Sequence, residues 1–249
     1  MNYILKNDYI QVFKDLNLEE NAIIYLKYKD IKDSVLLGEE RSIVESLKEV
    51  IGSDYSIVTN FKFRQSFDLA FFDGDLLSCK EIKSKLINTA NLYKNICGDN
   101  LVEALKLEDY EISPNYIYPY IAIGKIKAAV KNNQALNYPE GSDSPLGLLY
   151  NLKAYCILIN TDYSETSIFR LSEFFSKKKA HILNQSKDNS FRLVNFLDYE
   201  ANPKDYDEIG KLLEKENLVK IFNIKDHVIK VFKIEDAVNL GQKYLISKY

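Results

Sequence analysis

The chain has 249 residues, of which 46% are hydrophobic and 12% aromatic. This is enough apolar material for a sizeable buried core, and it excludes disorder as the dominant state. The 33 Lys and Arg residues are nearly balanced by 36 Asp and Glu residues, and the net charge is -3. Such a composition gives no electrostatic signal for a nucleic acid or an anionic membrane, and we expect neither partner.

The cysteines, the histidines and the hydropathy of the chain further narrow the class of protein. No stretch approaches the roughly 20 apolar residues of a membrane span, and residues 1–14 carry Asp and Lys instead of a signal-peptide core. We therefore expect a soluble cytoplasmic protein. The three cysteines, Cys79, Cys97 and Cys156, lack a CxxC spacing, and the two histidines are His181 and His227. We expect no metal site, buried apolar cysteines, and structural or exposed histidines.

Helix and strand patterns alternate along the chain without a Gly-, Ser- or Pro-rich linker. We therefore expect one α/β domain over residues 1–249, with helices covering a sheet. Apolar periodicity and the Gly and Pro positions predict, in chain order, helix 8–16, strand 22–28, helix 39–51, strand 55–61, helix 78–97, strand 116–123, helix 124–130, a helix from 145, strand 154–159, a polar turn 161–167, helix 168–175, strands 180–183 and 191–197, a helix from 203, strands 218–224 and 228–232, and helix 234–246.

Two prolines make specific predictions. Pro119 removes a hydrogen-bond donor from strand 116–123, so it should lie at an edge, a bulge or a strand end. Pro145 follows Ser144, and a Ser N-cap before Pro at the first helical position indicates a helix start. The sequence contains no P-loop, GxGxxG, GxSxG or HExxH motif, so those chemistries have no motif support.

Asp162 and Glu165 lie in the turn after strand 154–159. Ligands of open α/β sheets bind beyond the carboxyl ends of strands, so this pair is a candidate for acid–base chemistry. The alternative is capping and solvation, the commoner role of acidic residues at a helix start. The three lysines at 177–179 allow a phosphate-binding role or, more commonly, a favourable interaction with a helix end.

Short motifs in the second half of the chain carry a resemblance to a known family. The motif residues are Ala122, Ile123 and Gly124; Asp143, Ser144, Pro145, Leu146 and Gly147 with Leu149, Tyr150 and Leu152; and Thr166 and Ser167 with Leu171 and Glu173. Their order resembles that of the A-x-G, D/G-S-P-L-G-x-L-Y-x-L and T-S-x-x-L-x-E motifs of the aminoglycoside 3-N-acetyltransferase family, and the first two motifs also agree in spacing. The resemblance implies an α/β fold, a three-layer α/β/α sandwich with a mixed central sheet.

The same resemblance implies transfer of an acyl group, most simply acetyl, from acetyl-CoA or another acyl-CoA to an amine of an amino sugar or aminoglycoside-like acceptor. A nucleotide-linked or cell-envelope amino sugar is favoured over an antibiotic. In that family a histidine with a carboxylate partner takes the amine proton, and the S-P block helps to line the pantetheine tunnel. A group with a pKa near 7 suits this proton transfer best.

The polar motifs of the family are altered in this chain. Asp162 stands at the position of the family's histidine, and an aspartate is a weaker base unless burial raises its pKa. The family's H-S-S segment is replaced at residues 27–29, its P-T-F-T segment at 59–62, and its H-P-x-x-S segment at 115–119. The candidate catalytic residues are Asp162 and Glu165, and the candidate cofactor contacts are Ser144, Pro145, Leu146, Thr59, Asn60, Lys27 and Tyr28.

Two functions of different class stay open at this point. The main prediction is an active acyl-CoA-dependent N-acyltransferase. The alternative is a catalytically impaired member of the same fold that acts as a binding or partner protein. The missing histidine favours the alternative, whereas the retained length and order of elements favour neither.

Overall fold

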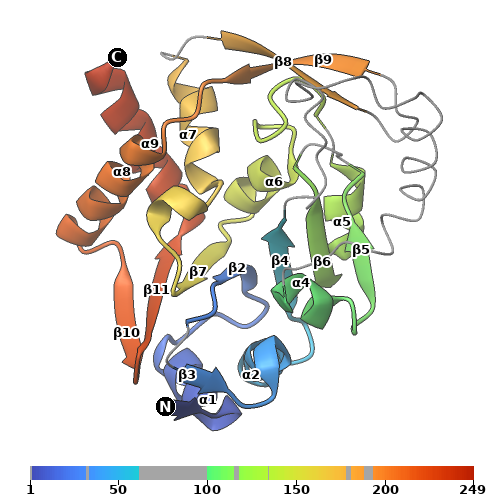
Figure 1. Cartoon of the computed structure of the whole chain (residues 1–249), viewed down its shortest axis with the longest axis vertical. Helices are drawn as coiled ribbons and strands as arrows, with labels where there is room; N and C mark the ends of the chain where they lie inside the picture. Colours follow the sequence, from blue (N-terminus) through green and yellow to red (C-terminus); the bar gives the residue numbers. More distant parts are fainter. Residues whose placement is uncertain are drawn as a thin grey trace, which may run out of the picture.

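A seven-stranded sheet forms the centre of the structure (Figure 1), a computed structural model that describes residues 2–31, 34–61, 100–114, 118–133, 135–177, 181–187 and 193–249. The strands lie in the order β10-β11-β7-β2-β4-β6-β5. Their bounds are β2 (Ile23–Tyr28), β4 (Ser56–Asn60), β5 (Tyr110–Ile112), β6 (Tyr120–Gly124), β7 (Tyr155–Ile159), β10 (Lys220–Ile224) and β11 (His227–Lys233).

The three inner strands of this sheet run parallel, because β2 pairs in parallel with both β4 and β7. The outer pairs, β10 with β11, β11 with β7, β4 with β6, and β5 with β6, are antiparallel. The parallel strands therefore end at one edge, where Tyr28 pairs with Ile159. Since β6 runs the opposite way, its first residue, Tyr120, pairs with Asn60 at the same edge.

Helices cover both faces of the sheet. One face packs against α1 (Lys6–Asp15), α2 (Glu39–Ile51) and α4 (Asn100–Leu105), and the other against α5 (Lys127–Asn132), α6 (Pro145–Asn151), α7 (Ile168–Ser176), α8 (Pro203–Lys215) and α9 (Ile234–Lys248). Successive strand residues point to opposite faces, so Ile24 and Leu26 belong to the first core and Tyr25 to the second. This confirms the predicted three-layer α/β/α sandwich with a mixed central sheet.

Two short ribbons lie outside the central sheet. β1 (Asn2–Ile4) pairs in parallel with β3 (Ser34–Leu36), and β8 (His181–Lys187) pairs antiparallel with β9 (Leu193–Tyr199). The second ribbon is bonded to the body of the protein: Tyr138 N donates to Leu197 O at 2.6 Å, and Arg170 Nη1 donates to Tyr199 O at 2.9 Å. These bonds hold β9 beside α7, which matters for the site.

Most predicted elements are present, and the differences have physical causes. Pro119 lies just before β6, and Pro145 is the first residue of α6. The helix predicted from residue 124 begins at Lys127 instead, because Gly124 is the last residue of β6, with φ +78. A Cβ at Gly124 would lie 2.0 Å from the carbonyl oxygen of Tyr55, so only glycine allows this approach.

Some described elements were not predicted, and one predicted helix lies outside the described residues. The strands β1, β3 and β5 and the helix α4 were not predicted, since their three to six residues are too few to show a period. The predicted helix 78–97, with Cys79 and Cys97, lies outside the described residues. Cys156 is a buried free thiol, as expected, in β7.

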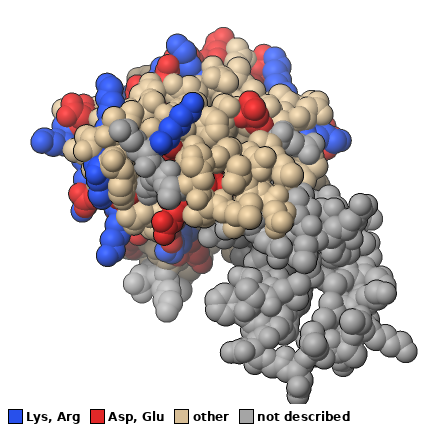
Figure 2. Space-filling view, turned by 90° about the horizontal axis from the view of Figure 1, so that it is seen from above, with Lys and Arg blue, Asp and Glu red and all other residues tan. Residues whose placement is uncertain are grey.

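Figure 2 shows the end of the molecule on which β8 and β9 lie in Figure 1. Lys and Arg side chains are interspersed with Asp and Glu along its margin, around a largely uncharged centre. This arrangement agrees with the near balance of 33 basic and 36 acidic residues. Within the described ranges, no helix combines the length and the apolar character that a membrane crossing requires.

The helix start at Ser144 gives a prediction of stability. Ser144 is buried, and its Oγ accepts the Gly147 N–H at 3.2 Å and donates to Gly141 O at 2.7 Å. Ser144→Ala should lower the free energy of unfolding by about 0.5–2 kcal/mol, measured by urea unfolding. Ser247→Ala is the control: Ser247 is exposed, so its loss should cost no more than about 0.5 kcal/mol. Equal costs for the two variants would show that the cap contributes nothing.

A second prediction concerns the buried His227. Its Nδ1 lies 2.6 Å from Tyr9 Oη and its Nε2 2.9 Å from Ser34 Oγ, and burial lowers its pKa below 6.5. The neutral form is thus favoured in the folded state, so its contribution to stability is complete above pH 6.5 and is lost as the pH falls below that value.

The wild-type free energy of unfolding should therefore fall more steeply below pH 6.5 than that of His227→Gln. The slope is measured by urea unfolding at a series of pH values. The exposed His181 supplies the control, because His181→Gln should keep the wild-type slope. Parallel curves for wild type and His227→Gln would contradict the prediction.

Candidate active site

Polar side chains gather where the parallel strands end. Lys27 Nζ, from β2, donates to the backbone oxygen of Asn60, from β4, at 2.5 Å. The Asn60 side chain accepts from Tyr25 Oη at 2.6 Å, and its Nδ2 donates to Ser167 Oγ at 3.0 Å. Ligands of open α/β sheets bind beyond such strand ends. Lys27, Asn60 and Ser167 thus mark the candidate site.

Ser167 has an unusual local role. It is the residue before α7, where a serine normally accepts a backbone N–H of the first turn. Its side chain makes no such bond, and Ile168 N donates instead to Thr166 Oγ1 at 3.4 Å. The Ser167 hydroxyl lies 3.2 Å from Tyr120 Oη and 3.4 Å from Tyr25 Oη. It is therefore directed into the polar cluster and away from the helix.

The cluster continues into the protein at Glu140. Tyr120 Oη donates to Glu140 Oε1 at 2.9 Å, and both side chains are buried. An unbroken series of polar contacts therefore runs from Asn60 at the sheet edge, through Ser167 and Tyr120, to a buried carboxylate.

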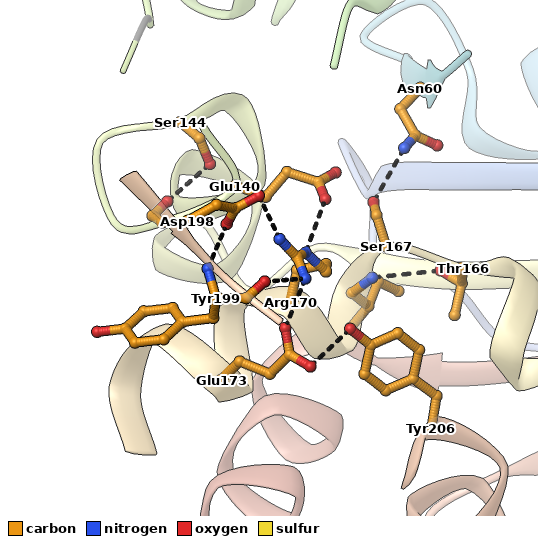
Figure 3. A network of polar contacts seen from close by, with 12 residues as sticks. Asn60, Glu140, Ser144, Thr166, Ser167, Arg170, Glu173, Asp198, Tyr199 and Tyr206 are labelled. Atoms are coloured by element: carbon orange, nitrogen blue, oxygen red, sulfur yellow. Dashed lines mark hydrogen bonds and ion pairs between the residues drawn. The ribbon is translucent and has the colours of Figure 1, made fainter. Parts of the chain in front are cut away.

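Glu140 also belongs to a group of charges around Arg170 (Figure 3). Arg170 lies 2.5 Å from Asp198, 2.9 Å from Glu173 and 3.7 Å from Glu140. All four side chains are buried. One guanidinium therefore faces three carboxylates, and Glu173 gains a further donor from Tyr206 Oη at 2.8 Å. This excess of acid is the main electrostatic property of the site.

Burial shifts the pKa values of the carboxylates and tyrosines in the cluster. Burial raises the pKa of Glu140 to about 7, although Arg170, Ser167 and Tyr120 oppose the shift. Burial also raises the pKa of Asp198, again against the attraction of Arg170. The pKa values of Tyr25 and Tyr120 are raised by burial as well, so both hydroxyls keep their protons near neutral pH. Glu140 thus combines a pKa near neutrality with a hydrogen-bonded connection to the sheet edge.

The sequence-predicted carboxylates occupy a different place. Asp162 precedes the 3-10 turn η2 (Tyr163–Glu165), is exposed, and donates from its backbone N–H to Glu165 Oε2 at 3.3 Å. Glu165 Oε1 also pairs with Lys29 Nζ at 2.6 Å. A Cβ on Gly210 of α8 would lie 2.1 Å from the Tyr163 ring, so α8 fixes this turn by close packing. Glu165 therefore has the capping role that was the alternative reading.

The predicted cofactor contacts divide into two groups. Lys27, Tyr28, Thr59 and Asn60 lie at the ends of β2 and β4; Thr59 Oγ1 donates to Asn60 O at 3.3 Å, and Tyr28 Oη to Asp30 at 3.3 Å.

Ser144, Pro145 and Leu146 form the second group and are buried at the start of α6, where Ser144 acts as the N-cap. Of the lysines at 177–179, Lys177 follows α7 in the left-handed region, with φ 51, and the other two lie outside the described residues.

Sequence reasoning missed Glu140, Arg170 and Asp198. One signal was available: Arg170 and Glu173 are charged residues three apart in an otherwise uncharged helix, and a pair on a buried face needs partners. Glu140 lies in an irregular segment and Asp198 in a distant strand, so no local pattern connects them to Arg170.

Comparison with known proteins identifies the family. Residues 106–246 match the family described as aminoglycoside 3-N-acetyltransferase. A curated relative, the SPbeta prophage-derived aminoglycoside N(3')-acetyltransferase-like protein YokD of Bacillus subtilis (strain 168), is 26% identical over 141 residues, which are 54% of this chain and 50% of that protein. The match thus spans about half the length of this relative.

Solved structures show the same fold over nearly the whole chain. The crystal structure of YokD from Bacillus subtilis has a TM-score of 0.81 at 17% identity and covers 97% of this chain and 93% of that one. AAC-IIIb with CoASH has a TM-score of 0.80 at 11% identity, covering 100% and 98%. AAC-VIa bound to sisomicin has a TM-score of 0.80 at 13% identity, covering 100% and 99%. Since the family match takes in more than half of the sequence, the chain belongs to the aminoglycoside 3-N-acetyltransferase family.

Proposed function

We propose that the protein transfers an acetyl group from acetyl-CoA to an amine of an amino sugar. The family match over residues 106–246 carries this proposal. Two proteins with the same fold support it, since one was solved with CoASH and the other with the aminoglycoside sisomicin. The polar cluster at the carboxyl ends of β2 and β4 is where this fold class binds ligands.

The reaction requires a base and no covalent enzyme intermediate. The acceptor amine is protonated near neutral pH and must lose a proton before its lone pair can attack the thioester carbonyl carbon. The new N–C bond then forms as the C–S bond breaks, and the sulfur leaves as a thiolate that takes up a proton. The protein has to hold the two substrates side by side and accept the amine proton.

For the acyl-CoA, the sheet edge offers Lys27, Tyr28, Thr59 and Asn60 on two adjacent parallel strands. A cation and several hydroxyl and amide groups suit a ligand that carries phosphates and peptide-like amides. Ser144, Pro145 and Leu146 complete the proposed cofactor contacts by placing the pantetheine arm against the start of α6.

For the acceptor, Asp162 and Glu165 are the proposed carboxylates. Both lie in the turn that follows β7, at the same edge as Tyr28. Exposed carboxylates at that place suit the ammonium groups of an amino sugar, and a carboxylate in contact with the ammonium can also take its proton. Glu165 would first have to leave Lys29, so Asp162 is the more available of the two.

A specific observation supports the alternative of an impaired member that binds a ligand or partner without transfer. Neither histidine lies in the site: His227 is buried between Tyr9 and Ser34, and His181 contacts Tyr138 on the β8–β9 ribbon. The family's usual base is therefore missing, and activity requires a carboxylate instead.

Calorimetric titration with acetyl-CoA and with CoA separates the two functions at the cofactor site. We expect binding of both in the micromolar range, followed by thiol release when an amino sugar is added. The acceptor panel is sisomicin, glucosamine and a nucleotide-linked amino sugar, assayed by thiol release. No binding of either nucleotide would reject the acyltransferase and leave the partner protein as the function to pursue.

Asp162→Asn tests the acceptor side. Acetyl transfer should fall while the affinity for acetyl-CoA stays within about twofold of wild type, because the carboxylate contacts the amine and not the nucleotide. Thiol release measures the first quantity and calorimetry the second. Glu165→Gln is the matched variant, and it should have a smaller effect because Lys29 already holds that carboxylate. Loss of acetyl-CoA binding in Asp162→Asn would instead make Asp162 a cofactor contact.

A further inference from the structure

We propose that Glu140 is the group on which the amine proton comes to rest, and that the proton reaches it through the hydroxyls of Ser167 and Tyr120. This inference rests on the proposed acetyl transfer and names the proton acceptor that the missing histidine leaves open. The direction of the hydrogen bonds, the burial of Glu140 and the charges around it support this role.

The hydrogen bonds of the cluster have a fixed direction. Tyr25 Oη donates to Asn60 Oδ1, which leaves the Asn60 amide to donate from Nδ2 to Ser167 Oγ at 3.0 Å. Tyr120 Oη donates to Glu140 Oε1 at 2.9 Å. The Ser167 proton then has two acceptors, Tyr120 Oη at 3.2 Å and the more distant Tyr25 Oη at 3.4 Å. The Tyr120 hydroxyl therefore points toward Glu140, and so does the Ser167 hydroxyl when it donates to Tyr120.

Ser167 can receive a proton from a substrate. A serine hydroxyl has two acceptor positions and one donor. Asn60 Nδ2 occupies one acceptor position, and the second is available to an ammonium N–H at the sheet edge, where Ser167 is half-buried. A proton from the ammonium would bond to Ser167 Oγ as the Ser167 proton moves to Tyr120 Oη and the Tyr120 proton moves to Glu140. The amine becomes neutral, both hydroxyls are restored, and Glu140 gains the proton.

The surroundings of Glu140 allow it to accept a proton near neutral pH. Burial raises its pKa to about 7, which is the range for a base that acts on an amine. Titratable and charged groups from several elements face Glu140. Helix α7 contributes Arg170 and Glu173, and strand β9 contributes Asp198. The tyrosines are Tyr120 of β6, Tyr118 just before β6, and Tyr25 of β2. Among the residues that the structure describes, Arg170 is the cation that faces Glu140, and it is shared with Glu173 and Asp198.

Glu140→Gln is the direct test, because it keeps the shape and an acceptor for Tyr120 but cannot take the proton. It also removes one of three buried negative charges, so the variant should fold, as checked by circular dichroism. We expect its kcat to fall by about 100-fold or more, with acetyl-CoA affinity unchanged. Wild-type kcat should rise with pH around a midpoint near 7, and the variant should lack this inflection.

Two further variants separate proton transfer through Ser167 and Tyr120 from the roles of the neighbouring residues. Tyr120→Phe removes the middle hydroxyl and keeps the ring, so kcat should fall while Glu140 stays in place. Asp162→Asn should raise KM for the amino sugar and keep the pH inflection, because the proton still reaches Glu140. A Glu140→Gln enzyme with wild-type kcat, or loss of the inflection in Asp162→Asn alone, would overturn the inference and leave acetyl transfer standing.

An infrared measurement makes the test independent of turnover. In the resting protein, the band of a protonated carboxyl group should disappear as the pH is raised through about 7, and Glu140→Gln should lack that band. Its absence from wild type overturns the inference. A wild type that binds acetyl-CoA but acetylates no member of the panel overturns the proposed function and this role together.

Discussion

The buried guanidinium of Arg170 is the interaction on which the site depends. It holds three carboxylates that come from separate parts of the chain: Glu140 before α6, Glu173 in α7 and Asp198 in β9. Removing one partner of a buried ion pair typically costs about 3–5 kcal/mol, because the other charge is left buried without compensation. Arg170 therefore joins the β8–β9 ribbon and the turn before α6 to the helix that begins at the sheet edge.

The same interaction sets the chemistry of the site, because one cation does not neutralise three anions. Burial raises the pKa of both Glu140 and Asp198, and the attraction of the single guanidinium opposes this shift without cancelling it. A fully compensated pair would keep its carboxylate ionised at neutral pH and make it a poor proton acceptor. Burial is thus the main reason that Glu140 has a pKa of about 7, and the Arg170 guanidinium, which is shared with Glu173 and Asp198, does not cancel that shift.

The fold could be predicted from the sequence to a large extent, because its signals are local. The helix over 39–51 shows its apolar period in thirteen residues and agrees with α2 (Glu39–Ile51) at both ends. Ser144 and Pro145 mark the start of α6 by cap chemistry alone. The strands that were missed, such as β5 (Tyr110–Ile112), have three residues and depend on pairing with a neighbour for their existence.

The sequence pointed to candidate site residues only where family motifs gave a comparison. Lys27 and Asn60 became candidates because residues 27–29 and 59–62 stand where the family has polar motifs after two predicted strands. Glu140 was not, because its properties come from burial and from partners 30 and 58 residues away along the chain, Arg170 and Asp198. Asp162 drew attention through its position in a motif, although the structure leaves it exposed. The pKa of a side chain depends on its tertiary contacts, and the apolar period of a sequence gives no information about these contacts.

The backbone arrangement explains how a carboxylate deep in the core can serve a reaction at the sheet edge. β6 runs antiparallel to β4, so Tyr120 lies opposite Asn60. Its ring enters the second core, and its hydroxyl lies between Ser167 and Glu140. Lys27 and Tyr25 hold the backbone and the amide of Asn60, and this fixes which atom of the amide donates. The direction of the whole hydrogen-bond series therefore follows from the register of two strands, and proton acceptance at Glu140 needs no group that moves between the edge and the core.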